Sequence, residues 1–235
     1  MFKAILFSLF LFIISGSLLA QPSVGQKIGK WDNQIYIQDV NGRPMSAKYI
    51  GVDGFPYLVK DFKFGSIELK NGRKFSSVPL KLDLVAQEII FLSPNKEEGV
   101  IGSDFVKEVT LIDTTDAGQN TYIMRSGFPS IDNYKSNQFC QVIADGKITL
   151  LKSMVKTIDT RKNELSGEIS KEFTLTEDFF TFQNGAMSRF KRDKENILSI
   201  MFDKRALMEN FLKENKRNFK NEAYLTKIFL HYNNN

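Results

Sequence analysis

Histidine and cysteine are almost absent from this sequence of 235 residues, which holds one of each, His231 and Cys140. Serine and cysteine nucleophiles ordinarily depend on an imidazole that accepts their proton, and zinc sites use several thiolates or imidazoles. His231 lies near the C-terminus, far in sequence from Cys140. We therefore assign no catalytic residue, no metal ligand and no cofactor. A single cysteine also excludes an intramolecular disulfide, and we interpret Cys140 as a buried, inert thiol in a strand rather than as a reactive or intermolecular one.

The common catalytic motifs are missing as well, because the sequence contains no HExxH, CxxC, P-loop, GxGxxG or GxSxG pattern. Chemistry based on two carboxylates needs neither imidazole nor thiol, and the chain has 27 Asp and Glu residues. No pattern marks a pair at the separation that glycosidases use. A polar stretch at 113–120 lacks the spacing of an EF-hand and is interpreted as a loop rich in turn formers. A carboxylate-based hydrolase acting on glycans therefore remains an alternative only.

Long apolar runs are scarce, and the one that stands out lies at the N-terminus. Lys3 precedes the run 4–14, which is apolar except for Ser8, and small residues follow at 15–17. A charged start, a short apolar core and a small residue at the end are typical of a secretory signal peptide. The core is shorter than the roughly 20 residues that a spanning helix needs. We expect a signal peptide at 1–20 with cleavage after Ala20, or alternatively after Ser17.

This leader predicts an exported protein, periplasmic, extracellular or associated with the outer membrane, with no membrane span once the leader is removed. The formal net charge of the chain is +5, and the stretch 186–220 holds ten Lys and Arg against five Asp and Glu. An exported protein without a nucleic-acid recognition motif is not expected to bind nucleic acid. We interpret the basic stretch as a solvated helix face, with loose attraction to an anionic envelope surface as the alternative.

Alternating apolar and polar residues indicate strands over most of the mature chain. The segments 34–38, 66–70 and 80–84 show this period of two, and 88–92 and 105–112 are also expected to be strands. Asn71-Gly72, Asp145-Gly146 and Asn184-Gly185 are typical hairpin turns. Further strands are expected at 139–143, 148–155, 171–175 and 178–182, with a charged loop over 160–167. The pattern predicts a mainly β (α+β) fold: an antiparallel sheet, sandwich or open barrel built from hairpins.

The period changes near the C-terminus, where the sequence predicts two or three short helices. Asp193 is the expected N-cap of a helix at 194–202, Asp203 of one at 204–215, and Asn221 begins a third. Such short helices are marginal alone, so they must pack on the sheet or on one another. We therefore divide the chain into a signal peptide at 1–20, a β-rich domain at 21–192 and a helical segment at 193–235 packed on it.

Three aromatic residues are less easily buried than the many phenylalanines of the strands. Trp31 precedes the first predicted strand, and Phe55 and Tyr57 belong to the turn Gly54-Phe-Pro-Tyr57. Aromatic side chains exposed on such turns can bind sugars or partner chains, whereas local packing over a sheet edge is the simpler interpretation. We keep Trp31, Phe55 and Tyr57 as weak candidates for contact with a ligand or a partner.

Several of these motifs together resemble a group of small exported bacterial proteins of unknown function. The resemblance is carried by Gly54-Phe-Pro-Tyr-Leu, by the Phe64 strand with its Asn-Gly turn, and by Val78-Pro-Leu-Lys-Leu-Asp-Leu. It continues through Thr149-Leu-Leu-Lys and the Phe180 hairpin to the closing helix, and covers most of residues 50–234. It implies an exported, β-rich protein with a short helical C-terminus, and it implies no activity, cofactor or catalytic residue.

These observations favour an exported, non-enzymatic protein of the cell envelope with a binding or structural role. Its expected partner is an envelope protein or a glycan. A carboxylate-based glycan hydrolase is one alternative. A carrier of lipid or another apolar ligand is the other, because phenylalanine-rich strands could curve around an apolar cavity.

The leader generates a direct prediction. Expression in a host with an intact secretory pathway, followed by intact-mass measurement of the exported product, should give a chain that begins at Gln21. A product that begins at Leu18 is the alternative, after cleavage at Ser17. Recovery of the full-length chain from the cytosol alone would contradict the interpretation.

Overall fold

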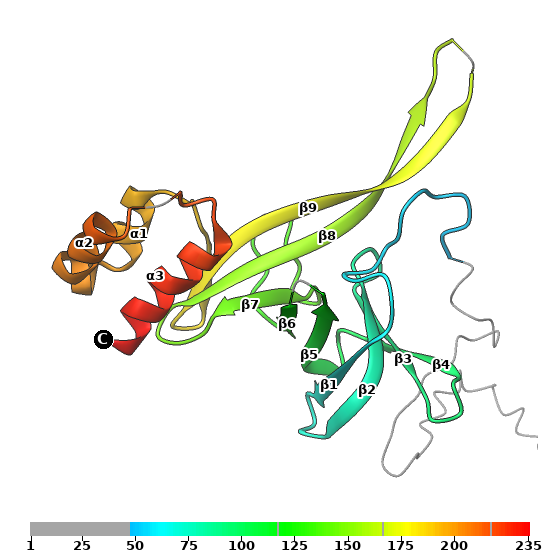
Figure 1. Ribbon diagram of the computed structural model, residues 1–235, viewed down its shortest axis with the longest axis horizontal. Coiled ribbons are helices and arrows are strands. Elements are labelled where there is room, and N and C mark those ends of the chain that lie inside the picture. The colour runs from blue at the N-terminus through cyan, green and yellow to red at the C-terminus, as the bar shows by residue number, and fades with distance from the viewer. Residues whose placement is uncertain (1–47, 117, 166, 217) are drawn as a thin grey trace, which may run out of the picture.

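The computed structural model describes residues 48–116, 118–165, 167–216 and 218–235. The predicted signal peptide, Trp31 and the predicted strand at 34–38 lie outside the described residues. Within them the chain forms one antiparallel sheet and a group of helices at the C-terminal end (Figure 1). The strands are β1 (Lys63–Leu69), β2 (Lys74–Asp83), β3 (Glu88–Leu92), β4 (Glu98–Gly102), β5 (Val106–Thr115), β6 (Gly118–Arg125), β7 (Cys140–Ala144), β8 (Thr149–Lys162), β9 (Ile169–Gln183) and β10 (Ala186–Arg189).

The sheet is open, with the strand order β10-β9-β8-β7-β6-β5-β1-β2-β3-β4. The mainly β fold with short C-terminal helices is thus confirmed, and of the predicted arrangements the open sheet is the one found. The pairing between β6 and β7 is short, joining Met124 to Gln141 and Arg125 to Cys140. Because so few backbone hydrogen bonds connect the two parts there, the sheet can turn sharply between β1–β6 and β7–β10.

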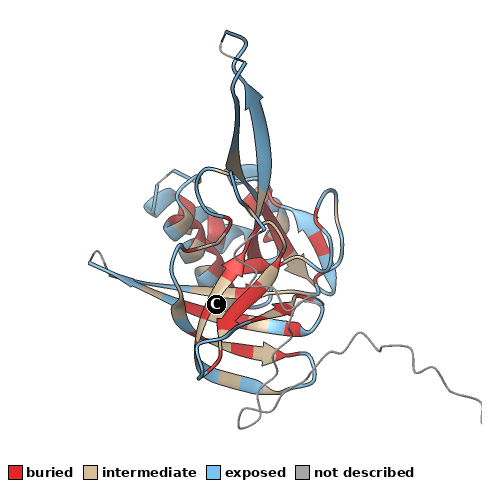
Figure 2. Ribbon diagram, turned by 90° about the vertical axis from the view of Figure 1, so that its right-hand side faces the viewer, coloured by how far each residue is buried: buried red, intermediate tan, exposed pale blue. Residues whose placement is uncertain are grey.

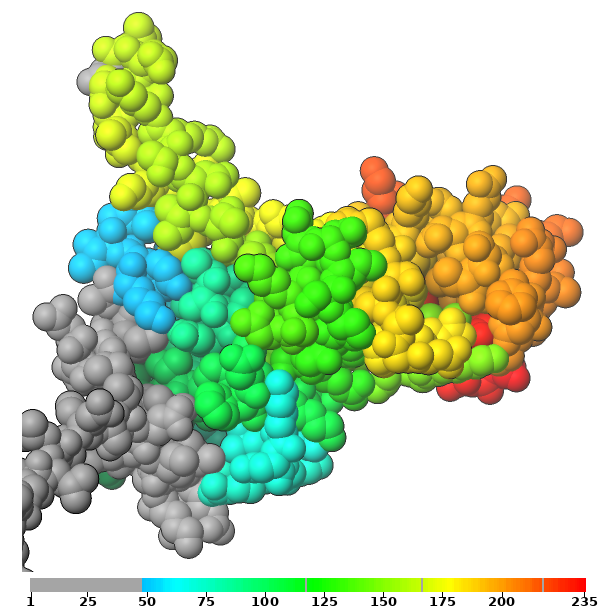
Figure 3. Space-filling model, turned by 180° about the vertical axis from the view of Figure 1, so that it is seen from behind, coloured from blue at the N-terminus to red at the C-terminus, as the bar shows by residue number. Residues whose placement is uncertain are grey.

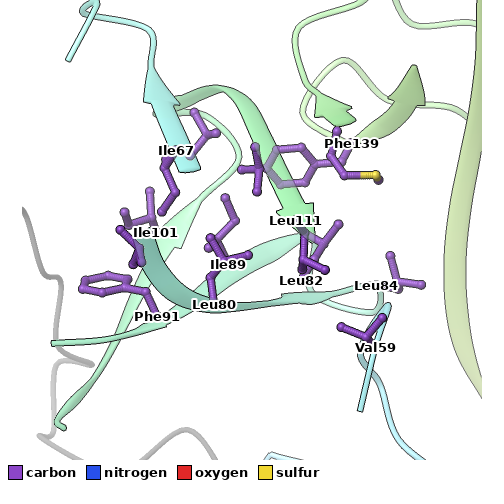
Figure 4. Packing of buried hydrophobic residues seen from close by; sticks show 14 of the residues in the cluster. Val59, Ile67, Leu80, Leu82, Leu84, Ile89, Phe91, Ile101, Leu111 and Phe139 are labelled. Carbon is purple, nitrogen blue, oxygen red and sulfur yellow. The ribbon is translucent and has the colours of Figure 1, made fainter. Parts of the chain in front are cut away.

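This bend in the sheet packs both parts, β1–β6 and β7–β10, against one apolar cluster. Its members from β1 to β5 include Leu80, Leu82 and Leu111, and Figure 4 shows Phe139 beside them. Phe139, which directly precedes β7, is fully buried, and Met154 of β8 belongs to the same cluster. Burial of these side chains, at roughly 1.5–3 kcal/mol each, favours the curled over the flat sheet.

A buried glutamine joins the same parts by hydrogen bonds. The Gln87 amide nitrogen donates to the carbonyl oxygens of Leu84 (2.9 Å) and Met154 (3.2 Å), and its oxygen accepts from the backbone N–H of Phe139 (2.9 Å). Lys156 of β8 adds a backbone bond to the Leu84 carbonyl (3.0 Å). The turn between β2 and β3 is therefore fixed against β8 and against the entry to β7.

The helices are α1 (Lys194–Ile200), a 3₁₀ turn (Phe202–Lys204), α2 (Arg205–Glu214) and α3 (Glu222–Asn234). They pack on β7–β9 through a second cluster that includes Leu150, Phe179, Ile197, Leu225 and Phe229 (Figures 1 and 2). The predicted N-caps are confirmed for two helices and wrong for one, as the side-chain hydrogen bonds at the first turn of each helix show.

Asp193 accepts a hydrogen bond from the backbone of Asn196 (2.8 Å), and Asn221 accepts one from that of Tyr224 (3.0 Å), so both are N-caps as predicted. Asp203 does not cap α2, whose N-cap is Lys204 with no side-chain bond. The Asp203 carboxylate instead binds the Lys147 ammonium (2.6 Å) and the Tyr232 hydroxyl (2.9 Å). These long-range contacts replace the local cap.

The hairpin turns also follow their predictions in part. Asn184 and Gly185 both have positive φ (51° and 78°), as a two-residue turn requires. At the first hairpin only Gly72 does, because Leu69 and Arg73 enclose a three-residue loop. The loop predicted at 113–120 is wrong, since β5 continues to Thr115 and β6 begins at Gly118.

The largest correction concerns the charged loop predicted at 160–167. β8 continues to Lys162 and β9 begins at Ile169, so the two strands form one long hairpin. It extends far from the sheet body in Figure 1, and Figure 2 shows its outer part exposed on both sides. Its polar residues suit strands that have water on either face, which is why their composition resembles that of a loop.

Replacement of the buried glutamine tests the connection between the two parts of the sheet. Gln87→Leu should lower the free energy of unfolding by about 2–3 kcal/mol, because the Phe139 N–H and the Met154 carbonyl lose their bonds to the amide, whereas the Leu84 carbonyl keeps the N–H of Lys156. Gln119→Leu, at an exposed position of β6, is the matched control and should change stability by less than about 0.5 kcal/mol. Urea unfolding of both variants measures the difference, and equal effects would exclude the proposed role of Gln87.

Candidate interaction surface

The single cysteine lies in an apolar cluster and the single histidine beside an aromatic ring. Cys140 is fully buried, and burial raises the pKa of its thiol to about 12, so the nucleophilic thiolate is scarce at neutral pH. The His231 ring stacks on Phe211, with ring centroids 4.2 Å apart. Across the described ranges, His, Cys, Asp and Glu form no group of three or more that could hold a metal ion.

Phe55 and Tyr57 lie on the segment 48–62, which crosses from β3 to the hairpin of β8 and β9. The structure brings these two candidates together through Lys156 of β8. Its ammonium group donates to the backbone oxygens of Phe55 (2.7 Å) and Tyr57 (3.0 Å) and lies 4.2 Å from the centroid of the Phe55 ring. Phe55 keeps 37% of its surface exposed. Burial lowers the pKa of Lys156.

A second lysine lies between aromatic rings of the same segment. The Lys81 ammonium group is 4.8 Å from the Tyr57 ring centroid and 4.3 Å from that of Phe62. Cation–π contacts of this kind stabilise by about 0.5–1 kcal/mol at exposed sites. The aromatic candidates therefore help to hold their own segment in place. Trp31, the third candidate, is outside the described residues.

The segment is further fixed by a tyrosine and a buried carboxylate. The Tyr49 hydroxyl donates to Asp83 (2.8 Å), whose other oxygen accepts the backbone N–H groups of Val85 and Ala86. The Tyr49 ring also meets Phe173 of β9 edge to face, at 5.5 Å between centroids. Burial raises the pKa of Tyr49, and the Asp83 carboxylate raises it further.

Backbone bonds complete the attachment. Asp53 donates to the carbonyl oxygen of Lys171 (2.8 Å) and accepts from the N–H of Phe173 (3.3 Å). The segment therefore adds to the outer edge of β9, beyond the point where β10 ends. In Figure 3 the chain near residue 50 lies against the base of the projecting hairpin. The segment 48–62 thus acts as a brace for that hairpin.

We call residues 156–175 the arm. Four of its apolar side chains are exposed: Leu165 at 99%, Ile169 at 62%, Leu175 at 45% and Ile158 at 39%. Two-stranded hairpins without a covering layer are marginally stable in water, so the brace at the base matters for the shape of the arm. Its outer part has no packed layer in Figure 2. The arm is the most prominent exposed apolar element among the described residues.

The register of the arm sorts its side chains into two unlike faces, because paired residues share a face and neighbours alternate. One face holds the pairs Lys156 with Leu175, Ile158 with Phe173, Thr160 with Lys171, and Lys162 with Ile169. We call it the apolar–lysine face. The polar face holds Thr157 with Thr174, Asp159 with Glu172, and Arg161 with Ser170. Arg161 also forms an ion pair with Glu172 (2.6 Å).

Sequence reasoning predicted the strand at 171–175 but missed the rest of the arm, although a signal was present. Every second residue from Lys156 to Lys162 and from Ile169 to Leu175 belongs to the apolar–lysine face. Lysine interrupts the apolar positions, so the alternation is not one of apolar with polar residues. A search for period-two alternation that counts lysine together with isoleucine and leucine would have predicted both strands of the arm.

Comparison with protein-family models, curated proteins and solved structures gives no match for this chain. By its fold, the protein belongs to the class of open antiparallel sheets, with helices at the C-terminus and one projecting hairpin. In the part of the chain that the structure describes, no helix is long and apolar enough to cross a membrane.

The Tyr49–Asp83 bond generates a pH-dependent prediction. Tyr49→Phe should lower the free energy of unfolding by about 1 kcal/mol at neutral pH, because the carboxylate loses a donor. The raised pKa of folded Tyr49 means that the bond contributes fully below the unfolded pKa, about 10, and is lost as the pH rises above it.

The difference between wild type and Tyr49→Phe should therefore shrink between neutral pH and about pH 10.5 in urea unfolding. Tyr122→Phe, which removes a hydroxyl from another half-buried tyrosine, controls for the general effect of alkali. A difference that stays constant or grows with pH would contradict the assigned bond.

Proposed function

We propose that this chain is an exported, non-enzymatic binding protein of the cell envelope, and that the arm is its contact surface. The predicted leader at 1–20 supports export. The single observation that carries the binding role is the arm itself, with four exposed apolar side chains on a braced hairpin. Exposed apolar surface of this kind is typical of sites where a soluble protein meets a partner or a membrane.

The attachment of the arm supports the same function. Its base is held by Asp53 on the outer edge of β9, by Tyr49 against Phe173, and by Lys156 on the turn of Phe55. These contacts hold the arm in a defined direction and leave its outer half exposed. A contact element held in place before binding loses less conformational entropy when it binds. This arrangement suits recognition better than a loop that is merely long.

Burial of the single thiol supports a role without thiol catalysis. The Cys140 thiol is buried and protonated at neutral pH, and His231 is stacked on Phe211. Lysine is the commonest charged residue of the apolar–lysine face, where it extends from exposed strands. These exposed lysines suit a protein that binds its partner through the surface of the arm.

An arm-shortened variant tests the proposal. Residues 161–170 are replaced by Asn-Gly, so that a two-residue turn joins the paired positions Thr160 and Lys171. Cell fractionation in the organism that makes the protein should show wild type in the envelope fraction. The variant should shift to the freely soluble exported fraction, because it lacks the outer contact surface.

The matched control replaces the turn between β3 and β4 (93–97) by Asn-Gly, at the far end of the sheet. Thermal unfolding of both variants confirms that the body is folded. The control should stay with the envelope. Retention of the arm-shortened variant in the envelope fraction, equal to wild type, would contradict the proposal, as would recovery of wild type from the cytosol.

A further inference from the structure

The two faces of the arm differ in charge as well as in hydropathy. The apolar–lysine face between 156 and 175 carries three lysines, four apolar residues and one threonine, and no carboxylate. Both carboxylates of the paired residues, Asp159 and Glu172, lie on the polar face, where Arg161 neutralises Glu172. The paired part of the arm is therefore an amphipathic ribbon whose apolar side is cationic, whereas the loop at its tip carries two further carboxylates, Glu164 and Glu168.

At the base of the arm, residues of the apolar–lysine face contact the segment 48–62. Tyr49 covers Phe173, and the Lys156 ammonium group is held by the carbonyl oxygens of Phe55 and Tyr57. Opposite Phe173 the side chain of Ile158 is 39% exposed, and further out the side chains of Lys171, Lys162 and Ile169 are exposed. The available surface is thus the outer half, which ends at the fully exposed Leu165.

We propose that this outer half binds the surface of an anionic lipid bilayer, an inference that rests on the proposed binding function and specifies its partner. Ile158, Ile169 and Leu165 enter the boundary between headgroups and acyl chains. The ammonium groups of Lys162 and Lys171 remain among the lipid phosphates. The threonines, serine and carboxylates of the polar face stay in water.

The lysines of the apolar–lysine face select this occupant. Lysine has a long apolar stem and a mobile charged end, so it can bury its stem beside isoleucine while its ammonium group reaches an anionic headgroup. Amphipathic elements with apolar residues and lysines on their membrane-facing side lie at the bilayer interface in this way. The segment from Ile158 to Lys162 is about 13 Å long at the rise of a strand, enough to lie along such a surface.

Binding of the purified mature protein to vesicles tests the proposal. Phosphatidylcholine vesicles that contain phosphatidylglycerol should bind the protein in cosedimentation at low salt, and vesicles of phosphatidylcholine alone should bind it much less. Added salt should weaken the binding, because it screens the lysines. The arm-shortened variant should lose it.

Two neighbouring residues provide a matched comparison of the two faces. Lys162→Gln and Arg161→Gln each remove one positive charge from adjacent positions on opposite faces. Lys162→Gln should weaken binding roughly five-fold, the effect expected for one basic residue at an anionic surface, and Arg161→Gln should have a much smaller effect. Ile169→Ser should also weaken binding, whereas Ser170→Ala on the polar face should not.

Each outcome decides the question. Loss of binding for Lys162→Gln and Ile169→Ser with retention for their polar-face controls supports the lipid surface. Equal effects of the two charge removals would indicate general electrostatic attraction and overturn the proposal. Absence of vesicle binding, while the arm-shortened variant still leaves the envelope fraction in cells, overturns the lipid partner but preserves the binding function, with an envelope protein as the partner.

Discussion

The curled shape of the sheet depends on one buried amide. Gln87 binds the carbonyls of Leu84 and Met154 and the N–H of Phe139, so it joins the turn between β2 and β3 to the neighbouring strands β7 and β8, from which the strand order separates it. The short pairing between β6 and β7 gives the sheet freedom to turn, and the apolar cluster around Phe139 favours the turn. The amide then selects one geometry, because buried polar groups are stable only when their partners are placed correctly.

That geometry positions the arm. β8 contributes its first half to the core through residues such as Leu150 and Leu151, and its second half leaves the body as the inner strand of the arm. The bond from Lys156 to the Leu84 carbonyl lies where the core half gives way to the arm, beside the brace of residues 48–62. The same strand thus links the packed core to the exposed surface. A change at the turn of β2 and β3 would be transmitted to the base of the arm through this connection.

The sequence allowed the class of fold, several turns and two helix caps to be predicted, because these depend on local chemistry. Asn184-Gly185 and the cap Asn221 are examples, since a tight turn and a helix start each need particular residues nearby. Asp203 shows the limit, because distant Lys147 and Tyr232 compete successfully for its carboxylate. Apart from the strand at 171–175, the arm was missed because strands exposed on both faces lack the usual apolar–polar alternation. Export and the role of the leader remain predictions from the first twenty residues.

The central claim, that the outer arm contacts a membrane surface, can be measured by fluorescence. Cys140 is buried and its thiol is protonated at neutral pH, so a cysteine introduced by Leu165→Cys can be labelled selectively with an environment-sensitive dye. The emission should shift to the blue on addition of vesicles that contain phosphatidylglycerol, while a label introduced by Thr157→Cys on the polar face should shift far less. Unchanged emission from position 165 at vesicle concentrations that sediment the protein would contradict the account.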